Sequence, residues 1–398
     1  MSSSRPEWDV VVVGAGPAGA SAALSVLRRA PDTRVLLLDR DDFPRDKCCG
    51  DGIAAQAVDV LGQLGAGDVV DDWSPVQGLH LATGRREVRG QMARPAWVVP
   101  RAVLDARIVA HAVAAGAVLD RHRVRSVRVD HRTDGAVVVD GSVRAQVVIG
   151  ADGARSVVRG AVGSPPRGQT ALAIRGYAPT LPAHRGRQVI RWGTRPQPSY
   201  AWAFDRGDGF SNIGYGELAH APGLTRRLLL DELDRLLPGV AAGAGSWRAH
   251  HLPLSGRGWG PEQPDGPTLL VGDAAGLVNP LTGEGIYYAV ATGSLAGAAA
   301  VQALAAGRPT SAGGRHRAAV RRLLDRHLRH TWAASRLAGV AGVVDAGLLA
   351  SGHDQGVFDD LVEVGLGDGL LTPRLVGGLV GGLARGLVRD RTGRPTLT

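Results

Sequence analysis

The chain has 398 residues, a length that predicts two or three domains, or one large α/β domain with an insertion, and excludes a small disulfide-held scaffold. Hydrophobic residues make up 44% and charged residues 21%, as in ordinary globular proteins, but glycine contributes 57 residues, about twice its usual share. The formal net charge is +9, and because no basic block is interleaved with aromatic residues, we expect no nucleic-acid partner.

The cysteine content indicates a reducing compartment. Cys48 and Cys49 are the only cysteines, and sequence neighbours rarely meet the geometry of a disulfide. No N-terminal run resembles a signal peptide, and no stretch of about 18 uninterrupted apolar residues occurs, so we expect a cytoplasmic protein. The 12 histidines show no metal-ligand spacing, so no metal site is predicted, and the pair His250 and His251 is interpreted as surface.

The first 40 residues predict a strand–helix–strand unit. Residues 9–13 form a short apolar run that ends in glycine, which is typical of a strand buried in a parallel sheet. Residues 17–29 are rich in alanine and predict a helix, and residues 34–38 predict a second strand. Two later apolar runs, 147–149 and 269–271, also precede acidic residues, Asp152 and Asp273.

The middle and the end of the chain differ from this unit. Residues from about 170 to 264 hold most of the aromatic residues and show short alternating runs, which predicts an inserted antiparallel sheet. From residue 311 onward the pattern is helical, with glycine-rich interruptions between residues 339 and 386. The basic, amphipathic segment 315–332 favours a helix docked on its own domain, with peripheral contact to a membrane surface as the alternative.

A glycine motif joins the first predicted strand to the first helix. Gly14 permits a tight turn, Gly16 lets a pyrophosphate approach the backbone, and Gly19 with Ala23 lets the helix pack close to the sheet. Asp39 follows Gly19 by 20 residues, where an acidic side chain accepts ribose hydroxyls. Strand, turn, helix and acid together predict a dinucleotide site.

Three further motifs carry charge and glycine. Residues 43–52 read Phe-Pro-Arg-Asp-Lys-Cys-Cys-Gly-Asp-Gly and include Lys47, the only lysine of the chain. Residues 149–156 and 270–285 each place an acid after a buried strand, where doubly wound folds bind ligands. The last motif also opens an alanine-rich helix through a glycine-rich turn, which can bring backbone N–H groups against a ligand.

These four motifs, in this order, resemble the glutathione-reductase-type flavoproteins of the p-hydroxybenzoate hydroxylase fold. The combination of PRDKxCGDG, the Asp-Gly motif and GDAAxxxNPLxGEG resembles the geranylgeranyl reductase family of FAD-dependent oxidoreductases, over residues from about 8 to 300. The family's YxWxFP motif stands here as Tyr200-Ala-Trp202-Ala-Phe204-Asp205, and Asp205 in place of proline leaves the substrate open. Ala55 and Gln56 stand where the family often has a Pro-Arg pair.

The resemblance implies an α/β fold with three regions. The expected Rossmann-like FAD-binding domain is discontinuous, over 1–79, 98–168 and 265–310. An inserted antiparallel β-sheet substrate domain is expected over 80–97 and 169–264, and a helical C-terminal region over 311–398.

The resemblance also implies roles for individual residues. Cys49, Tyr200, Trp202 and Phe204 are the expected catalytic-site residues, with Cys49 near the isoalloxazine ring and the aromatic residues, joined by Tyr215, lining an apolar slot. Asp39 would hold the adenosine ribose, Arg101 the phosphates and Asp273 the ribitol, while the turn 281–285 would face the pyrimidine end of the flavin. The full expected FAD-binding set is Gly14, Gly16, Ala18, Gly19, Asp39, Arg40, Lys47, Cys49, Gly50, Arg101, Asp152, Gly153, Gly272, Asp273, Gly283, Gly285 and Ile286.

The leading hypothesis is a reductase that saturates C=C bonds of a prenyl, isoprenoid or related apolar substrate by hydride transfer from reduced FAD. An FAD-dependent monooxygenase of a specialised metabolite and a non-catalytic prenyl-binding protein are the alternatives. A flavin halogenase is disfavoured because the chain has no WxWxIP motif and no lysine outside the 43–52 loop. A second dinucleotide fingerprint is absent from the sequence, so the electron donor, NAD(P)H or ferredoxin, stays open, as does the oligomeric state.

Overall fold

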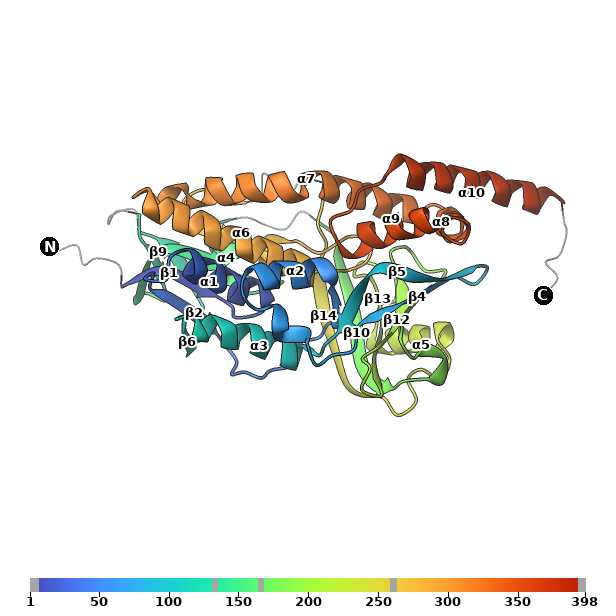
Figure 1. Ribbon diagram of the computed structural model, residues 1–398, viewed down its shortest axis with the longest axis horizontal. Coiled ribbons are helices and arrows are strands. Elements are labelled where there is room, and N and C mark those ends of the chain that lie inside the picture. The colour runs from blue at the N-terminus through green and yellow to red at the C-terminus, as the bar shows by residue number, and fades with distance from the viewer. Residues whose placement is uncertain (1–6, 131–134, 164–167, 258–262, 393–398) are drawn as a thin grey trace.

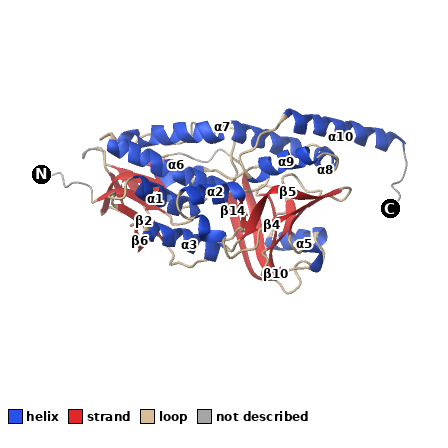
Figure 2. Ribbon diagram, in the orientation of Figure 1, coloured by secondary structure: helices blue, strands red, loops and turns tan. Residues whose placement is uncertain are grey.

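The computed structural model describes residues 7–130, 135–163, 168–257 and 263–392. Two β-sheets lie beside each other along the long axis of the molecule, and a layer of helices from the C-terminal part of the chain runs across both (Figure 1). The strands therefore form two separate groups, each with helices against it (Figure 2). This arrangement confirms the α/β fold with a second, antiparallel-rich sheet and a helical C-terminal region.

The first sheet has seven strands among the described residues. Its order is β6 (Val118–Arg121), β2 (Val35–Asp39), β1 (Trp8–Val13), β9 (Val143–Gly150), β8 (Val137–Val139) and β7 (Val127–Val129), with β15 (Thr268–Leu270) beside the end of β9. Strands β6, β2, β1, β9 and β15 pair in parallel. The continuous apolar runs predicted this for β1, β2, β9 and β15, because strands of a parallel sheet are buried on both faces, whereas β6 is an exposed edge strand. Their carboxyl ends deliver the turns after β1, β2, β9 and β15 to one edge of the sheet.

Two helices meet with almost no side chain between them. Helix α1 (Pro17–Arg29) confirms the predicted first helix, and it packs along α6 (Ile286–Ala305). A Cβ atom on Gly293 would lie 2.2 Å from the Ala18 carbonyl oxygen, and one on Gly297 would lie 2.5 Å from that of Ala22. Glycine at these positions allows the two backbones to touch.

Helix α6 is also the described helix that is long and apolar enough to cross a membrane by itself. Most of that stretch is buried inside the protein against α1, so its apolarity is that of a core helix. The remaining helices of this half are α2 (Ala55–Gln63), α3 (Arg101–Ala114) and α4 (Val157–Ala161).

The second sheet has eight strands in the described part of the chain. Its order is β14 (Gly245–Pro253), β10 (Thr170–Pro179), β13 (Phe210–Leu218), β12 (Tyr200–Asp205), β11 (Arg187–Trp192), β4 (Val76–Ala82), β5 (Glu87–Val98) and β3 (Gly52–Ala54). All neighbours are antiparallel except β11 and β4. The sheet thus includes β3 and most of β4, although both lie mainly before residue 80, where the substrate domain was expected to begin. The domain boundaries themselves stay a prediction.

The two faces of the second sheet have different partners. Helix α5 (Arg226–Leu236) covers one face, where Leu229 and Leu233 pack on Ala201 and Ala203 of β12. The C-terminal helices cover the β4–β5 end of the other face, where Leu348 and Phe358 pack on Leu79, Leu81 and Met92. Between these helices and β12 the second face of the sheet lines the cavity that is described below.

The C-terminal region comprises α7 (Ala312–Ala338), α8 (Val343–Ser351), α9 (Gln355–Leu366) and α10 (Pro373–Thr392). The helix expected over 315–332 is part of α7, and it docks on α6. Val320, Leu324 and Leu328 are buried on its inner side, as the amphipathic spacing predicted.

The α1–α6 contact predicts a strong effect of one added methyl group. Gly293→Ala should lower the free energy of unfolding by about 1–3 kcal/mol, because the new Cβ must displace the backbone of α1. Gly377→Ala on α10 is the matched control, since a Cβ there meets nothing within 4 Å, and it should be neutral or stabilising. Chemical denaturation of both variants is the measurement. Equal stability of both variants would contradict the packing argument.

Candidate active site

A single cavity of about 1060 Å³ lies where the two sheets and the C-terminal helices meet. Most small-molecule sites fall within roughly 300–1,000 Å³, so this space has room for more than one ligand group. Its polar end begins at the Gly14 turn and Asp39, and its apolar end reaches Leu375 and Leu379 of α10. The cavity is therefore continuous from the first sheet to the C-terminal helices.

The turn after β1 has the geometry that the glycine motif predicted. Gly14 has φ +99°, and a Cβ there would lie 2.4 Å from the Ala151 carbonyl oxygen. A Cβ on Gly19 would lie 1.8 Å from the Gly14 carbonyl oxygen, so Gly19 serves the helix–strand contact. Asp39 ends β2, and its Oδ2 accepts a 2.8 Å hydrogen bond from the amide of Ala15. An acid thus lies beside the N-terminus of α1.

Positive charge gathers at the same helix terminus. A Cβ on Gly16 would lie 3.5 Å from a guanidinium nitrogen of Arg45 and 3.7 Å from one of Arg101. Both arginines are held by the buried carboxylate of Asp105, to which Arg101 donates at 2.6 and 2.8 Å and Arg45 at 3.0 Å. The open space at Gly16, the helix N-terminus and two fixed cations fit a pyrophosphate, as FAD requires. Sequence reasoning found Arg101 but missed Arg45 and Asp105.

Asp152 lies in the cavity wall with its carboxylate occupied by the protein. Its Oδ2 accepts from the amide of Val157 at 2.6 Å, and Oδ1 accepts from the Ser156 hydroxyl at 2.5 Å, at the start of α4. The adjacent Gly153 has φ +79° and also lines the cavity. The Asp-Gly motif therefore shapes the turn after β9, and its role at the cofactor stays a prediction.

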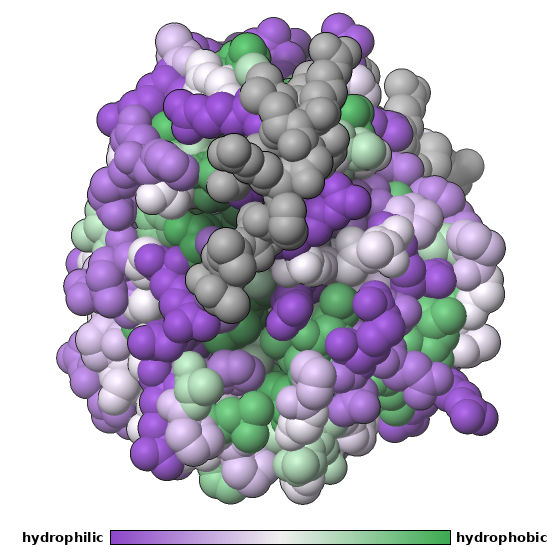
Figure 3. Space-filling model, turned by 90° about the vertical axis from the view of Figure 1, so that its right-hand side faces the viewer, coloured by the Kyte–Doolittle hydropathy of each residue, from purple (hydrophilic) through white to green (hydrophobic). Residues whose placement is uncertain are grey.

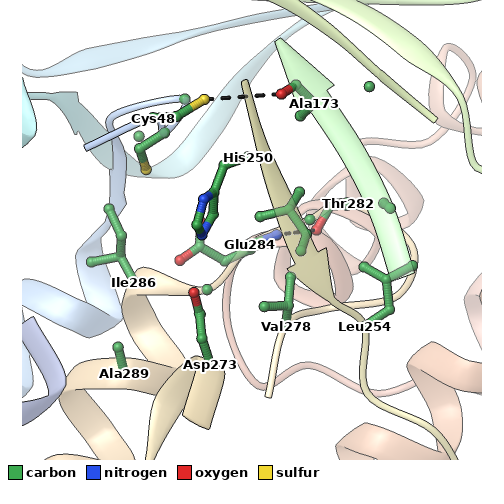
Figure 4. A pocket seen from close by; sticks show the side chains of 18 of the residues that line it. Cys48, Ala173, His250, Leu254, Asp273, Val278, Thr282, Glu284, Ile286 and Ala289 are labelled. Atoms are coloured by element: carbon green, nitrogen blue, oxygen red, sulfur yellow. Dashed lines mark hydrogen bonds between the residues drawn. The ribbon is translucent and has the colours of Figure 1, made fainter. Parts of the chain in front are cut away.

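A cluster of charged side chains lies around Asp273. Lys47 Nζ lies 3.2 Å from Asp273 Oδ2, and although burial opposes ionisation, Lys47 holds the pKa of Asp273 below its ordinary value. The ring of His250 projects from β14 toward Asp273 and Glu284 (Figure 4). Burial and the nearby Lys47 lower the pKa of His250 to about 4, so the ring is neutral at pH 7.

The interpretation of His250 as a surface residue is wrong. Strand β14 runs past the cavity, and alternation turns the side chain of His250 inward. The pair of histidines carried no signal of this, because neither residue belongs to a motif and the orientation depends on how β14 pairs with β10.

The turn 279–285 closes the cavity between α6 and α9. The side-chain amide of Asn279 donates to the Val364 carbonyl at 2.9 Å, and the Thr282 hydroxyl donates to that of Gly365 at 2.6 Å. Glu284 Oε1 accepts from the Tyr287 amide at 2.9 Å, so this carboxylate lies at the N-terminus of α6. Partial burial raises the pKa of Glu284 to about 7.

The loop 43–52 forms part of the wall as well. Burial raises the pKa of Cys48 to about 12 and also raises that of Cys49, so both side chains are neutral thiols at pH 7. Asp51 has φ +59° and no exposed surface, and it accepts hydrogen bonds from Tyr177 at 2.5 Å and from Asn212 at 2.8 Å. Asp51 therefore anchors the loop to the second sheet, a role that sequence reasoning missed.

Aromatic side chains form a row on the open face of the second sheet. Ring centroids of Trp192, Tyr200, Trp202 and Phe204 follow each other at 6.3, 6.0 and 6.4 Å, which confirms that alternation places the last three on one face. The Tyr200 hydroxyl donates to the Thr282 carbonyl, and Trp202 Nε1 donates to Asn212 at 2.8 Å. All four rings line the cavity.

The expectation that Tyr215 lines the apolar slot is wrong. Tyr215 is fully buried beneath α5, where its hydroxyl donates to Glu217 at 2.8 Å, because β13 pairs Gly214 with Trp202 and turns Tyr215 to the other face. Asp205 does not line the cavity; it accepts from the Gly186 amide at 2.6 Å and from the Thr180 hydroxyl at 3.1 Å. Asp205, which stands in place of the family's proline, thus makes loop contacts outside the cavity.

The apolar end of the cavity comes mainly from the C-terminal hundred residues, where the motifs gave no information. The wall combines strands of the second sheet with α7–α10, and includes Leu81, Ile190, Leu337, Leu348, Leu361 and Leu379. Of the expected FAD-binding and catalytic residues, all line the cavity except Gly19 and Gly272.

The Asp273 cluster predicts different effects for two aspartates. Asp273→Ala removes a charge that faces the cavity and should weaken FAD affinity about 10–100-fold, since a charge-assisted hydrogen bond contributes about 1.5–3 kcal/mol. Asp205→Ala should leave FAD affinity unchanged but lower the melting temperature, because it leaves the Gly186 amide without its partner. Fluorescence titration of flavin-free protein with FAD and thermal melting separate the two effects. Equal FAD affinity of both variants would show that Asp273 does not contact the cofactor.

Glu284 predicts a pH-dependent stability. A carboxyl group whose folded pKa is raised destabilises the folded protein as pH rises from about 4.5 to 7, and the penalty is constant above that range. Glu284→Gln should therefore be more stable than the parent at pH 8, and this difference should vanish below about pH 4.5. Chemical denaturation of flavin-free protein across this range measures it. A difference that does not change with pH would refute the raised pKa.

The comparisons agree with this site. A family model described as FAD binding domain matches residues 7–199. Over 72% of this chain and 75% of the relative, the sequence is 36% identical to a menaquinone reductase of Mycolicibacterium smegmatis. It is 33% identical to digeranylgeranylglycerophospholipid reductase 1 of Methanopyrus kandleri, over 75% of this chain and 81% of that protein.

A solved structure shares the fold. A geranylgeranyl bacteriochlorophyll reductase-like protein from Thermoplasma acidophilum superimposes with a TM-score of 0.73 over 96% of this chain and 98% of that one, at 21% identity. This likeness shows the fold, and the sequence relatives identify the class of enzyme. The chain belongs to the geranylgeranyl reductase family of FAD-dependent oxidoreductases.

Proposed function

We propose that this protein saturates C=C bonds in the isoprenoid chain of a lipid or quinone. The observation that carries the proposal is the continuity of one cavity from the FAD-binding turn, past the aromatic row, to an apolar end formed by α7–α10. The curated relatives are named for menaquinone and for a digeranylgeranylglycerophospholipid, both of which carry isoprenoid chains. Bound FAD, once reduced, supplies the hydride for such a reaction.

The residues of the chain would bind and orient both partners. Arg45 and Arg101 would hold the pyrophosphate, Asp39 and Asp273 would accept from the sugar and ribitol hydroxyls, and the aromatic row would contact the apolar chain. A Cβ on Gly50 would lie 3.4 Å from the ring of Phe204, so the loop packs against the row at this point and one wall of the cavity combines both. An isolated alkene is unreactive, so the reaction depends on the cavity holding the double bond in a fixed position beside the flavin.

Saturation also needs a proton at the second carbon. Cys48 and Cys49 hold theirs at pH 7 because burial raises the pKa of both thiols, and Glu284 titrates near neutral pH. All three groups lie in the wall of the same cavity, and Glu284 is our candidate for delivering the proton, because the pKa of a general acid works best near the operating pH. For the electron donor we propose NAD(P)H docking transiently, or a ferredoxin. We place the protein in the cytoplasm, at the surface of a membrane.

The proposal predicts reduction without oxygen. Dithionite-reduced enzyme mixed anaerobically with a panel of menaquinones and geranylgeranyl lipids should yield products heavier by two hydrogens per double bond, detected by mass spectrometry. A product that forms only with oxygen and carries an added oxygen atom would favour a monooxygenase. Binding without turnover of any panel member would favour a non-catalytic prenyl-binding protein.

The aromatic row predicts a substrate-specific defect. Phe204→Ala removes apolar contact area worth about 25 cal/mol per Å², and should raise KM for the prenyl substrate about tenfold while leaving the flavin spectrum unchanged. Phe210→Ala is the control, because Phe210 is exposed on the adjacent strand and does not line the cavity. Steady-state kinetics of both variants test this. If the KM of Phe204→Ala equals that of the parent, the substrate chain does not contact this row.

A further inference from the structure

Exposed apolar side chains gather at the outer end of the cavity. Leu337 and Val340, at the C-terminal end of α7 and just beyond it, are 44% and 55% exposed, and Val376 and Val380 of α10 are 46% and 63% exposed. A Cβ on Gly342, in the turn after α7, would lie 3.8 Å from a methyl of Leu383, so this turn contacts α10. We call this set, Leu337, Val340, Val376 and Val380, the apolar rim.

The apolar rim surrounds an opening of the cavity. Leu337 both lines the cavity and is exposed at the surface, and Leu379, one residue before Val380, also lines it. Apolar and polar surface residues alternate on the end of the molecule that Figure 3 shows. The apolar end of the cavity therefore reaches the outside between α7, α8 and α10.

Exposed arginines lie along α7, on the same side of the molecule as the apolar rim. Arg322, Arg326, Arg329 and Arg336 are exposed and recur at spacings of four, three and seven residues, which places them on one stripe of the helix. That stripe is opposite the buried Val320 and Leu324 that dock on α6. Because α7 and α10 run along one edge of the molecule, with α6, α8 and α9 packed beneath them, both exposed faces point outward on the same side (Figure 1).

We infer that this side is a docking face for an anionic lipid bilayer, with the apolar rim inserted among the acyl chains and the α7 arginines on the headgroup phosphates. The inference rests on the proposed function, because a water-insoluble isoprenoid substrate must pass from a membrane into the cavity. A protein partner on the rim would close the opening. A bilayer would instead bring the opening into contact with the lipid phase in which the substrate is dissolved. Exposed apolar side chains flanked by basic ones are the pattern that binds such surfaces.

Sedimentation of the FAD-loaded protein with vesicles tests the docking face. The parent protein should bind vesicles that contain phosphatidylglycerol, more weakly those of phosphatidylcholine alone, and less at high salt. The double variant Val376→Asp/Val380→Asp should lower the partition coefficient about tenfold or more. Val118→Asp is the matched control, because Val118 is a 48% exposed valine on β6 of the first sheet, and it should bind as the parent does.

The arginines have a matched control of their own. Arg322→Glu/Arg326→Glu should lower binding to the anionic vesicles about tenfold and remove most of its salt dependence. Arg226→Glu/Arg227→Glu, on exposed positions of α5 at the opposite side of the molecule, should leave both unchanged. Melting temperature and flavin absorbance confirm that each variant folds and holds FAD.

Three outcomes overturn the inference. The parent protein could fail to bind anionic vesicles, the Val376→Asp/Val380→Asp variant could bind as Val118→Asp does, or the rim could be a contact between two copies. In the last case the parent is a dimer that the rim variant makes monomeric, without vesicle binding by either.

Activity assays separate this inference from the proposed function. The rim variant should reduce a detergent-dispersed prenyl substrate at the parent's rate but lose most activity on the same substrate in vesicles. If no variant reduces any prenyl substrate while vesicle binding follows the pattern above, the proposed function fails and the docking face stands.

Discussion

The close contact between α1 and α6 fixes the distance between the two halves of the FAD site. At Gly293 and Gly297 the backbones of the two helices touch, and a single Cβ would overlap a carbonyl oxygen of α1. The N-terminus of α1 carries the Gly14 turn, and α6 begins at the turn that contains Glu284. Because both termini open into the cavity, the packing of two buried helices sets where a dinucleotide meets the turn 279–285.

The acidic and basic side chains at the polar end of the cavity bind one another. Asp105 fixes Arg45 and Arg101 beside Gly16, and Lys47 lies on Asp273. Low polarity around these groups strengthens each pair and makes an unpaired charge costly. Toward the second sheet the charges give way to neutral groups, the thiols of Cys48 and Cys49 and the aromatic row. The site thus changes from ionic to apolar over the length of one cavity.

Local patterns in the sequence predicted the parts of the site that depend on local geometry. The Gly14 turn, the acids after β2 and β15, and the common face of Tyr200, Trp202 and Phe204 follow from motif spacing or strand alternation. His250 and Tyr215 were misplaced because the face that each presents depends on which strand pairs with which.

The sequence did not predict the apolar end of the cavity, for a different reason. Its wall comes from helices α7–α10, which carry ordinary amphipathic patterns, and their inner residues face a cavity instead of a core. Asp105 was missed because a buried carboxylate that holds two arginines has no signature until the helix α3 is placed beside α1.

We propose that one cavity brings reduced FAD and an isoprenoid double bond together. Rapid anaerobic mixing of the reduced enzyme with a prenyl lipid, followed by flavin absorbance, measures this encounter. Oxidised flavin should reappear in a saturable phase, with one flavin oxidised for each double bond lost. Flavin that stays reduced in the presence of bound lipid, and is oxidised only when oxygen is admitted, would contradict it.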